Sequence, residues 1–281
     1  MSRSRPGIHA GEAAPDRAPH RHKKRFGQHF LHDPGLIRRI VQAVAPRPGE
    51  RLVEIGPGEG AITFPLLAEA GRLTVIEFDR DLVPRLAATA VGRGELDIVQ
   101  ADVLDVDFAT IGEGGKIRLV GNLPYNISSP ILFHCLAQAD VVTDMHFMLQ
   151  KEVVERMAAA PGSKVYGRLS VMLQLVCRVE PLFRVPPGAF TPPPKVDSAV
   201  VRLTPLEPAQ RPAADLGRVV ERIVRHAFGQ RRKTLANALH GVAGETAIRA
   251  AGIDPRQRAE QLAPEDFVRL AAIVARDGTT P

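Results

Sequence analysis

The amino-acid sequence predicts an α/β fold with a largely parallel sheet, followed by a small all-helical C-terminal domain. Between residues 51 and 159, short β-branched stretches alternate with stretches of helical periodicity, which is typical of a parallel sheet covered by helices on both faces. The glycine-rich turn Gly56–Gly60 joins the first strand of this series to its helix, as in nucleotide-binding sheets. A proline-rich linker then precedes a part with only helical patterns. The expected parts are a tail, 1–22, the sheet domain, 23–205, and the helical domain, 206–281.

Composition is that of a globular protein with one large domain or two modest ones. Hydrophobic residues make up 44% of the chain, which is enough to fill a core. No apolar run approaches the roughly 18 residues that a membrane span needs. The two cysteines, Cys135 and Cys177, lie far apart in apolar stretches and lack the spacing of metal ligands. We therefore expect buried thiols in a reducing cytoplasm, and no metal site.

Positive charge is concentrated at the N-terminus. Residues 1–25 hold seven Arg or Lys and two acids, which accounts for most of the net charge of +6. Such a basic arm suggests contact with a polyanion, and a solubilising tail is the alternative. Residues 1–20 are rich in Pro and Gly, which predicts disorder, and they lack the apolar segment of a secretory signal. The expected phosphate contacts of this arm are Lys23, Lys24 and Arg25.

The elements of the sheet domain follow from local signals. Asp33 and Pro34 are predicted to cap and begin a helix over 35–44. Two later strands are predicted to flank a proline-rich loop that the prolines make rigid. Strands are predicted at 51–55, 73–76, 96–99, 117–120, 145–149, 182–185 and 199–203. Further helices are predicted at 61–70, 79–90, 131–139, 151–159 and 168–177.

A nucleoside site is predicted where the first strands end. Gly56 and Gly58 allow a ligand to approach the backbone, and Glu77 ends the second strand, where an acid accepts both ribose hydroxyls. The glycine spacing is G-x-G-x-G rather than G-x-G-x-x-G, and Glu54 disfavours a phosphate. A cofactor with an amino group and no phosphate suits these residues better than a dinucleotide, which favours S-adenosylmethionine. Asp102 is expected to accept the amino group of an adenine ring, or alternatively to cap the helix that follows it.

The segment Asn122-Leu123-Pro124-Tyr125, after the fourth strand, is predicted to be the reactive centre. Open α/β sheets bind ligands at the carboxyl ends of their strands. The Asn122 side chain and the Leu123 carbonyl, which Pro124 keeps extended, offer two acceptors for the exocyclic amine of a planar base. Tyr125 offers a ring on which that base stacks. The alternative is an Asx turn beside a packed tyrosine.

The proline-rich loop 186–198 and the helical domain supply the remaining candidates. A rigid loop would hold Phe190 as the second wall of an aromatic clamp opposite Tyr125, and a packed Phe in a hairpin loop is the alternative. Three consecutive cations stand at the predicted start of a helix running to Leu239. The expected phosphate contacts in these segments are Lys195, Arg231, Arg232 and Lys233.

Six blocks of the chain, in this order, resemble the bacterial small-subunit (16S) ribosomal RNA adenine N6,N6-dimethyltransferases. The resemblance extends from about Lys24 to the last predicted helix. It implies a Rossmann-like methyltransferase domain that uses S-adenosylmethionine, with a helical C-terminal domain. The blocks are Phe26–Leu31, Glu54–Gly60, Asn122–Tyr125, Tyr166–Met172, Phe190–Ser198 and Phe228–Leu239.

The resemblance also implies a substrate and a set of cofactor contacts. Such enzymes transfer four methyl groups to the N6 atoms of two adjacent adenosines near the 3′ end of 16S rRNA, during small-subunit biogenesis. The expected partner is therefore 16S rRNA in the small-subunit precursor, and we expect a cytoplasmic monomer. Many members have Asn where this chain has His29. The implied cofactor contacts are His29, Leu31, Gly56, Glu77, Asp102 and Asn122, with Gly58 beside them.

Four alternatives remain open. Erythromycin-resistance methylases of large-subunit rRNA share the core but more often read N-I-P-Y or N-I-P-F, so Leu123 and the block Phe228–Leu239 favour the small-subunit enzymes. Methyltransferases of DNA adenine or protein glutamine usually read D-P-P-Y or N-P-P-Y. A non-catalytic assembly or transcription factor is disfavoured by the intact Glu77, Asp102 and Asn122, and a nicotinamide-dependent oxidoreductase by the glycine spacing. The preferred interpretation requires that Asn122 and Glu77 share one cavity.

Overall fold

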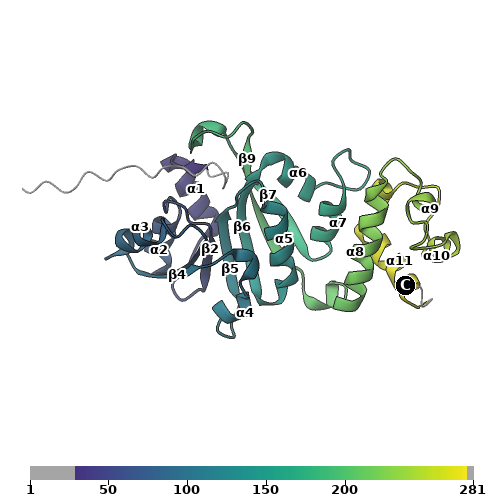
Figure 1. The fold of residues 1–281 in the computed structure, drawn as a ribbon, viewed down its shortest axis with the longest axis horizontal. Coiled ribbons are helices and arrows are strands. Elements are labelled where there is room, and N and C mark those ends of the chain that lie inside the picture. Colours follow the sequence, from purple (N-terminus) through teal and green to yellow (C-terminus); the bar gives the residue numbers. More distant parts are fainter. Residues whose placement is uncertain (1–28, 277–281) are drawn as a thin grey trace, which may run out of the picture.

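A seven-stranded sheet with the strand order β4-β3-β2-β5-β6-β9-β7 forms the centre of the larger part of the molecule (Figure 1). The computed structural model describes residues 29–276. The strands β2 to β6 pair in parallel, whereas β9 pairs antiparallel with β6 and β7. The predicted parallel sheet is thereby confirmed. The strands are β2 (Leu52–Ile55), β3 (Arg72–Glu77), β4 (Glu95–Gln100), β5 (Ile117–Asn122), β6 (Val142–Gln150), β7 (Cys177–Val185) and β9 (Ser198–Pro205).

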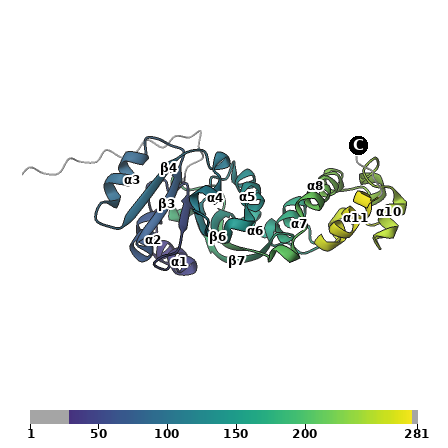
Figure 2. The ribbon, with the colours of Figure 1, turned by 90° about the horizontal axis from the view of Figure 1, so that it is seen from below.

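Helices cover both faces of this sheet, and Figure 2 shows α1 and α2 on one side with α5 on the other. Side chains alternate between the faces of a strand, so β5 contributes to two separate cores. Leu119 packs with residues of α5 and α6, whereas Val120 packs with residues of α1 and α2. The helices on the sheet are α1 (Pro34–Val44), α2 (Thr63–Ala70), α3 (Val83–Ala90), α4 (Phe108–Ile111), α5 (Ser128–Ala137), α6 (Lys151–Met157) and α7 (Arg168–Gln174).

A third core holds the helical part together, at the end of the molecule beyond α7 (Figure 1). Helix α7 belongs to two cores, because Leu173 packs under the sheet while Val171 packs among the C-terminal helices. Tyr166 is fully buried in this third core and its hydroxyl donates to the carbonyl of Leu262 at 2.9 Å. The third core therefore includes residues from before the expected boundary at 206. Its other helices are α8 (Ala214–Gly229), α9 (Leu235–Ala238), α10 (Glu245–Ala250) and α11 (Pro264–Arg276).

Local signals set most of the element boundaries. The side chain of Asp33 accepts a hydrogen bond from the Leu36 amide at 2.8 Å and caps α1, as predicted. The helix predicted over 168–177 is shorter, because β7 begins at Cys177 and pairs along its length with β9. The helix predicted to begin with three cations begins later, at Leu235, so Arg231–Lys233 lie in the turn after α8.

Burial confirms the prediction for the cysteines. Cys135 and Cys177 are buried free thiols, and burial raises the pKa of both, that of Cys177 to about 12. Among residues 29–276, no helix has the length and apolar character of a membrane span. The predicted tail and its candidates Lys23, Lys24 and Arg25 lie outside the described residues.

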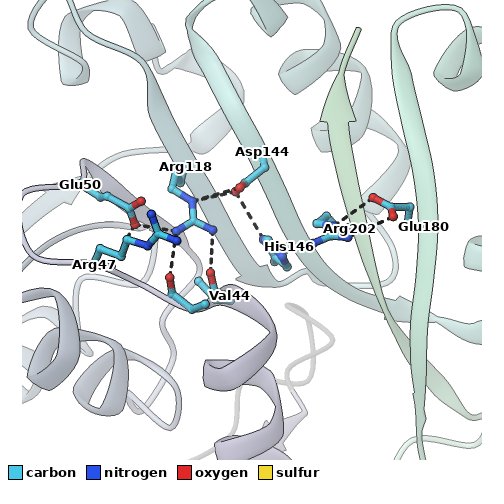
Figure 3. A network of polar contacts seen from close by, with 9 residues as sticks. Val44, Arg47, Glu50, Arg118, Asp144, His146, Glu180 and Arg202 are labelled. Atoms are coloured by element: carbon cyan, nitrogen blue, oxygen red, sulfur yellow. Dashed lines mark hydrogen bonds and ion pairs between the residues drawn. The ribbon is translucent and has the colours of Figure 1, made fainter.

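A buried arginine at the amino end of the sheet fixes the position of α1 (Figure 3). Arg118 of β5 donates to the Val44 carbonyl at 2.6 Å, one of the last carbonyls of α1, which lack partners within the helix. It also contacts Glu50 at 2.6 Å and Asp144 of β6 at 3.0 Å. The Arg118 side chain is only 12% exposed. Because α1 follows directly on the short strand β1 (Phe30–Leu31), this anchor also holds the segment that reaches the functional site.

Candidate active site

A cavity of about 750 Å³ lies at the carboxyl ends of β2, β3, β4 and β5. Its volume is within the range of small-molecule sites. Glu77 at the end of β3 and Asn122 at the end of β5 both line it. The structure thus has the shared cavity that the interpretation of the sequence requires.

The glycine turn after β2 forms one wall of this cavity. Gly58 and Gly60 have φ angles of +58° and +87°, in the left-handed region that favours glycine. A Cβ at Gly58 would lie 3.0 Å from the ring of Phe30, and one at Gly60 would lie 2.2 Å from the ring of Phe64. Side chains are therefore excluded at both positions, and the backbone itself faces the cavity.

Glu77 is held in one orientation by two backbone amides. Its Oε1 accepts a hydrogen bond from the Asp79 amide at 2.7 Å and its Oε2 accepts one from the Gly58 amide at 3.3 Å. Burial raises the pKa of this carboxyl, which is 6% exposed. A fixed acceptor at this strand end matches the predicted site for ribose hydroxyls.

Glu54 is a second acid in the cavity wall, and it is almost completely buried, with 1% of its surface exposed. Its Oε2 accepts no hydrogen bond from the part of the chain that the structure describes. Burial, together with the negative charge of Glu77, raises the pKa of Glu54 to about 8. A buried carboxyl oxygen without a hydrogen-bond partner is costly, so this wall fits a ligand that brings a positive charge or a hydrogen-bond donor.

Asp102 caps the turn that follows it and also lines the cavity. Its Oδ1 accepts a hydrogen bond from the Leu104 amide at 3.0 Å, which caps the 3₁₀ turn Val103–Asp105. The same residue lines the cavity. The cap therefore fixes the carboxylate beside the space where the cofactor's base is expected.

The segment after β5 presents its polar atoms in a fixed arrangement. The Asn122 Nδ2 donates to the carbonyl of His29 at 3.0 Å, which orients the amide and leaves Oδ1 as the acceptor for a ligand. The Leu123 amide donates to the Met148 carbonyl at 3.1 Å, so β6 holds the backbone at this point. Asn122, Leu123, Pro124 and Tyr125 all line the cavity.

Tyr125 is held at its ring and at its hydroxyl. The ring of His29 stacks on it, with centroids 5.5 Å apart and an interplanar angle of 29°. The Tyr125 hydroxyl lies 2.5 Å from the Ser198 hydroxyl. His29 reaches this position because β1 pairs with β8 (Phe190–Thr191), and its Nδ1–H donates to the Pro192 carbonyl at 2.8 Å.

Comparison with known proteins assigns the chain to a family. The model of the ribosomal RNA adenine dimethylase family matches residues 19–276. The chain belongs to that family. The dimethylase is 64% identical over 251 residues to the ribosomal RNA small subunit methyltransferases A of Xanthomonas campestris pv. campestris (strain B100) and Xanthomonas oryzae pv. oryzae (strain PXO99A), covering 89% of this chain and 95% of each relative.

Solved structures agree with this assignment. A dimethyladenosine transferase from Plasmodium falciparum superimposes with a TM-score of 0.74 at 26% identity, covering 89% of this chain and 98% of that one. The 23S rRNA methyltransferase ErmE superimposes with a TM-score of 0.67 at 27% identity, covering 88% and 99%. The resemblance and the methyltransferase fold predicted from the sequence are confirmed, and the dimethylase is an enzyme that uses S-adenosylmethionine.

Phe190 is the candidate that the structure places elsewhere. It is 2% exposed, packs in the core with Leu31 and Val120, and does not line the cavity. The cause is the pairing of β8 with β1, which turns Phe190 inward opposite Leu31. The structure thus shows the alternative, a packed phenylalanine, and the ring that faces Tyr125 is His29.

The basic candidates of the dimethylase differ in their surroundings. Lys195, Arg232 and Lys233 are exposed. Arg231 forms an ion pair with Glu260 at 2.9 Å, so it also holds the turn after α8 in place. These side chains lie outside the cavity wall.

Phe78 is a cavity residue that the sequence analysis missed. It follows Glu77 directly, and it is 57% exposed although large apolar side chains are usually buried. An exposed ring beside the ribose acceptor offers a surface for the base of the cofactor. Its position immediately after Glu77, the acid that ends β3, is the feature of the sequence that could have identified it.

Proposed function

We propose that this dimethylase transfers methyl groups from S-adenosylmethionine to the N6 atoms of two adjacent adenosines near the 3′ end of 16S rRNA, in the precursor of the small ribosomal subunit. The observation that carries the proposal is the single cavity lined by Glu77 and Asn122, which brings a nucleoside acceptor and an amine acceptor together. The relatives named small subunit methyltransferase A, at 64% identity, support this subunit as the substrate. We expect a cytoplasmic monomer.

The residues at one end of the cavity fit the cofactor. Glu77 would accept the ribose hydroxyls, while Asp102 and Phe78 would meet the adenine. Glu54, whose Oε2 has no partner among the described residues, would accept from the amino group of the methionine part. When bound, the cofactor supplies a methyl group on a positively charged sulfur. His29 and Leu31 line the same cavity and would close it from the side of β1.

Asn122 and Leu123 would activate the substrate amine. The lone pair of adenine N6 is delocalised into the ring, so the nitrogen is a weak nucleophile. Hydrogen bonds from N6–H to the Asn122 Oδ1 and to the Leu123 carbonyl favour a pyramidal nitrogen, whose lone pair is then available. The remaining requirement is alignment with the methyl group, which a rigid site supplies. No separate base is needed, because the methylated nitrogen is acidic enough to lose its proton to water.

Tyr125 would hold the base that enters the cavity. A nucleotide must leave its stack to reach such a site, at a cost of a few kcal/mol. Stacking on an aromatic side chain returns about 1–3 kcal/mol per base. The exposed cations Lys195, Arg232 and Lys233 would contact the phosphates, with Arg231 and the arm Lys23, Lys24 and Arg25 in the same role.

A methyl-transfer assay on several substrates tests the proposal. The purified protein is given labelled S-adenosylmethionine with undermethylated small subunits, large subunits, duplex DNA or protein. We expect label in small subunits only, recovered as N6,N6-dimethyladenosine. Label in large subunits would support the alternative, methylation of adenine in large-subunit rRNA, which the superposition with ErmE keeps open. Cofactor binding without transfer to any substrate would support a non-catalytic assembly factor.

A further inference from the structure

We propose that Ser198 is a positioning residue for Tyr125 and sets the rate of methyl transfer through the orientation of that ring, without touching the substrate. The inference rests on the proposed role of Tyr125 as the ring on which the adenine stacks. Ser198 is fully buried at the start of β9 and does not line the cavity. Any effect of Ser198 on the reaction must therefore pass through a neighbour.

That neighbour is Tyr125, whose hydroxyl makes a short contact with Ser198. The Tyr125 hydroxyl and the Ser198 hydroxyl are 2.5 Å apart, although 73 positions separate the two residues in the chain. Ser198 pairs with Gln150 of β6 and with Val185 of β7, so its backbone is held on both sides within the sheet. The hydrogen bond thus joins a loop residue of the cavity to an interior strand.

The other contacts of Tyr125 do not replace this bond. The Ser128 hydroxyl donates to the Tyr125 carbonyl at 3.2 Å, so it holds the backbone and not the ring. The His29 ring covers one face, but it belongs to the segment before the two-residue strand β1. Without Ser198, the ring loses its hydrogen bond to β9. A flat ring that turns presents the base to the methyl group at a changing angle, and misalignment slows transfer.

The bond also determines what the Tyr125 hydroxyl does not do. Because it contacts a serine that does not line the cavity, the hydroxyl is directed toward β9 rather than toward the expected position of the substrate amine. Asn122 and Leu123 remain the acceptors for N6–H, and the ring acts through its face. The competing explanation is that Ser198 merely needs a partner because it is buried. In that case its loss would lower stability without a specific effect on turnover.

A double-mutant cycle separates the two explanations. Ser198→Ala removes the bond from the strand, and Tyr125→Phe removes it from the ring while the buried serine stays. We expect each variant to lower kcat/KM for small subunits about tenfold, the equivalent of one hydrogen bond. The double variant should be no slower than the slower single variant, because both remove one interaction. The control is Ser129→Ala, which removes the hydroxyl of an exposed serine in α5, and its kcat/KM should match that of the parent.

Two outcomes of the kinetic cycle would overturn the inference. The first is a kcat/KM of Ser198→Ala equal to that of the parent. The second is a loss of kcat/KM in the double variant equal to the product of the losses in the two single variants. The dissociation constant of S-adenosylmethionine should stay unchanged in all variants, since β5 and β6 separate β9, where Ser198 lies, from β2, which leads into the glycine turn. A parallel loss of cofactor affinity would indicate general damage to the fold and would also contradict a positioning role.

Near-ultraviolet absorbance tests whether the bond between Tyr125 and Ser198 forms in solution. The chain has two tyrosines and no tryptophan, and the second tyrosine, Tyr166, is buried in the helical part. Ser198→Ala should shift the tyrosine band, and the same substitution in a Tyr125→Phe background should not. An unchanged band in Ser198→Ala would show that the bond does not form in solution.

Tyr125→Ala distinguishes failure of this inference from failure of the proposed role of Tyr125. An inactive Tyr125→Ala beside fully active Ser198→Ala and Tyr125→Phe would overturn the positioning role alone. A fully active Tyr125→Ala would overturn both, because the ring would then have no part in the reaction.

Discussion

Replacing Glu54 by Gln is expected to stabilise the folded dimethylase by an amount that grows with pH. Burial, together with the charge of Glu77, raises the pKa of Glu54 from 4.5 to about 8. Below the lower value the carboxyl is neutral in the folded and in the unfolded chain. Between the two values the folded chain keeps a proton that the unfolded chain has released, so the free energy of unfolding falls as pH rises. Above the higher value the two chains again bind protons equally.

The magnitude follows from the two pKa values. A rise from 4.5 to about 8 corresponds to roughly 5 kcal/mol, at 1.36 kcal/mol for each pH unit. About 4 kcal/mol of this falls between pH 5 and pH 8. Glutamine is neutral throughout and close in size, so the variant lacks this fall. Any cost of burying the amide is independent of pH and shifts the whole curve without changing its slope.

Urea unfolding followed by circular dichroism at pH 5, 6.5 and 8 measures the effect. The difference in unfolding free energy between Glu54→Gln and the parent should increase by about 4 kcal/mol in favour of the variant across this range. Glu59→Gln, in the glycine turn that follows β2 and with a side chain 41% exposed, is the control and should follow the parent. Parallel curves for Glu54→Gln and the parent would refute the reasoning, because the carboxyl would then be solvated or already paired.

Three further predictions concern catalysis, stability and RNA binding. Asn122→Ala should lower methyl transfer about 100-fold in the small-subunit assay while the affinity for the subunit persists, and an unchanged rate would end its proposed role. Arg118→Met should lower the free energy of unfolding by about 3 kcal/mol in urea, because it removes the guanidinium from the carboxylates of Glu50 and Asp144, and a loss under 1 kcal/mol would contradict this. The double substitution Arg232→Ala, Lys233→Ala should reduce the slope of log affinity against log salt by about 1–2, and an unchanged slope would remove both from the RNA contact.

Local signals made much of the fold and of the cavity wall predictable. Asp33 caps α1 through an amide three positions away, and Glu77 is oriented by the amide of Asp79, two positions away. The glycine turn and the strand that ends in Glu77 are similarly local. Patterns of this length are visible in a sequence because the interacting residues are neighbours.

Local signals do not predict contacts between residues that are far apart in the sequence. Asn122 bonds to His29 across 93 positions. That contact depends on the pairing of β1 with β8, two strands of two residues each, which are too short to show any periodicity. The same pairing buries Phe190, so the error in the predicted clamp and the missed role of His29 beside Tyr125 have one cause.

Mass spectrometry of small-subunit rRNA from a strain that lacks this protein tests the central claim most directly. We predict that the two adjacent adenosines near the 3′ end of 16S rRNA are unmethylated in that strain. The parent chain supplied on a plasmid should restore N6,N6-dimethyladenosine, and the Asn122→Ala chain should not. Fully dimethylated adenosines in the deletion strain would contradict the account.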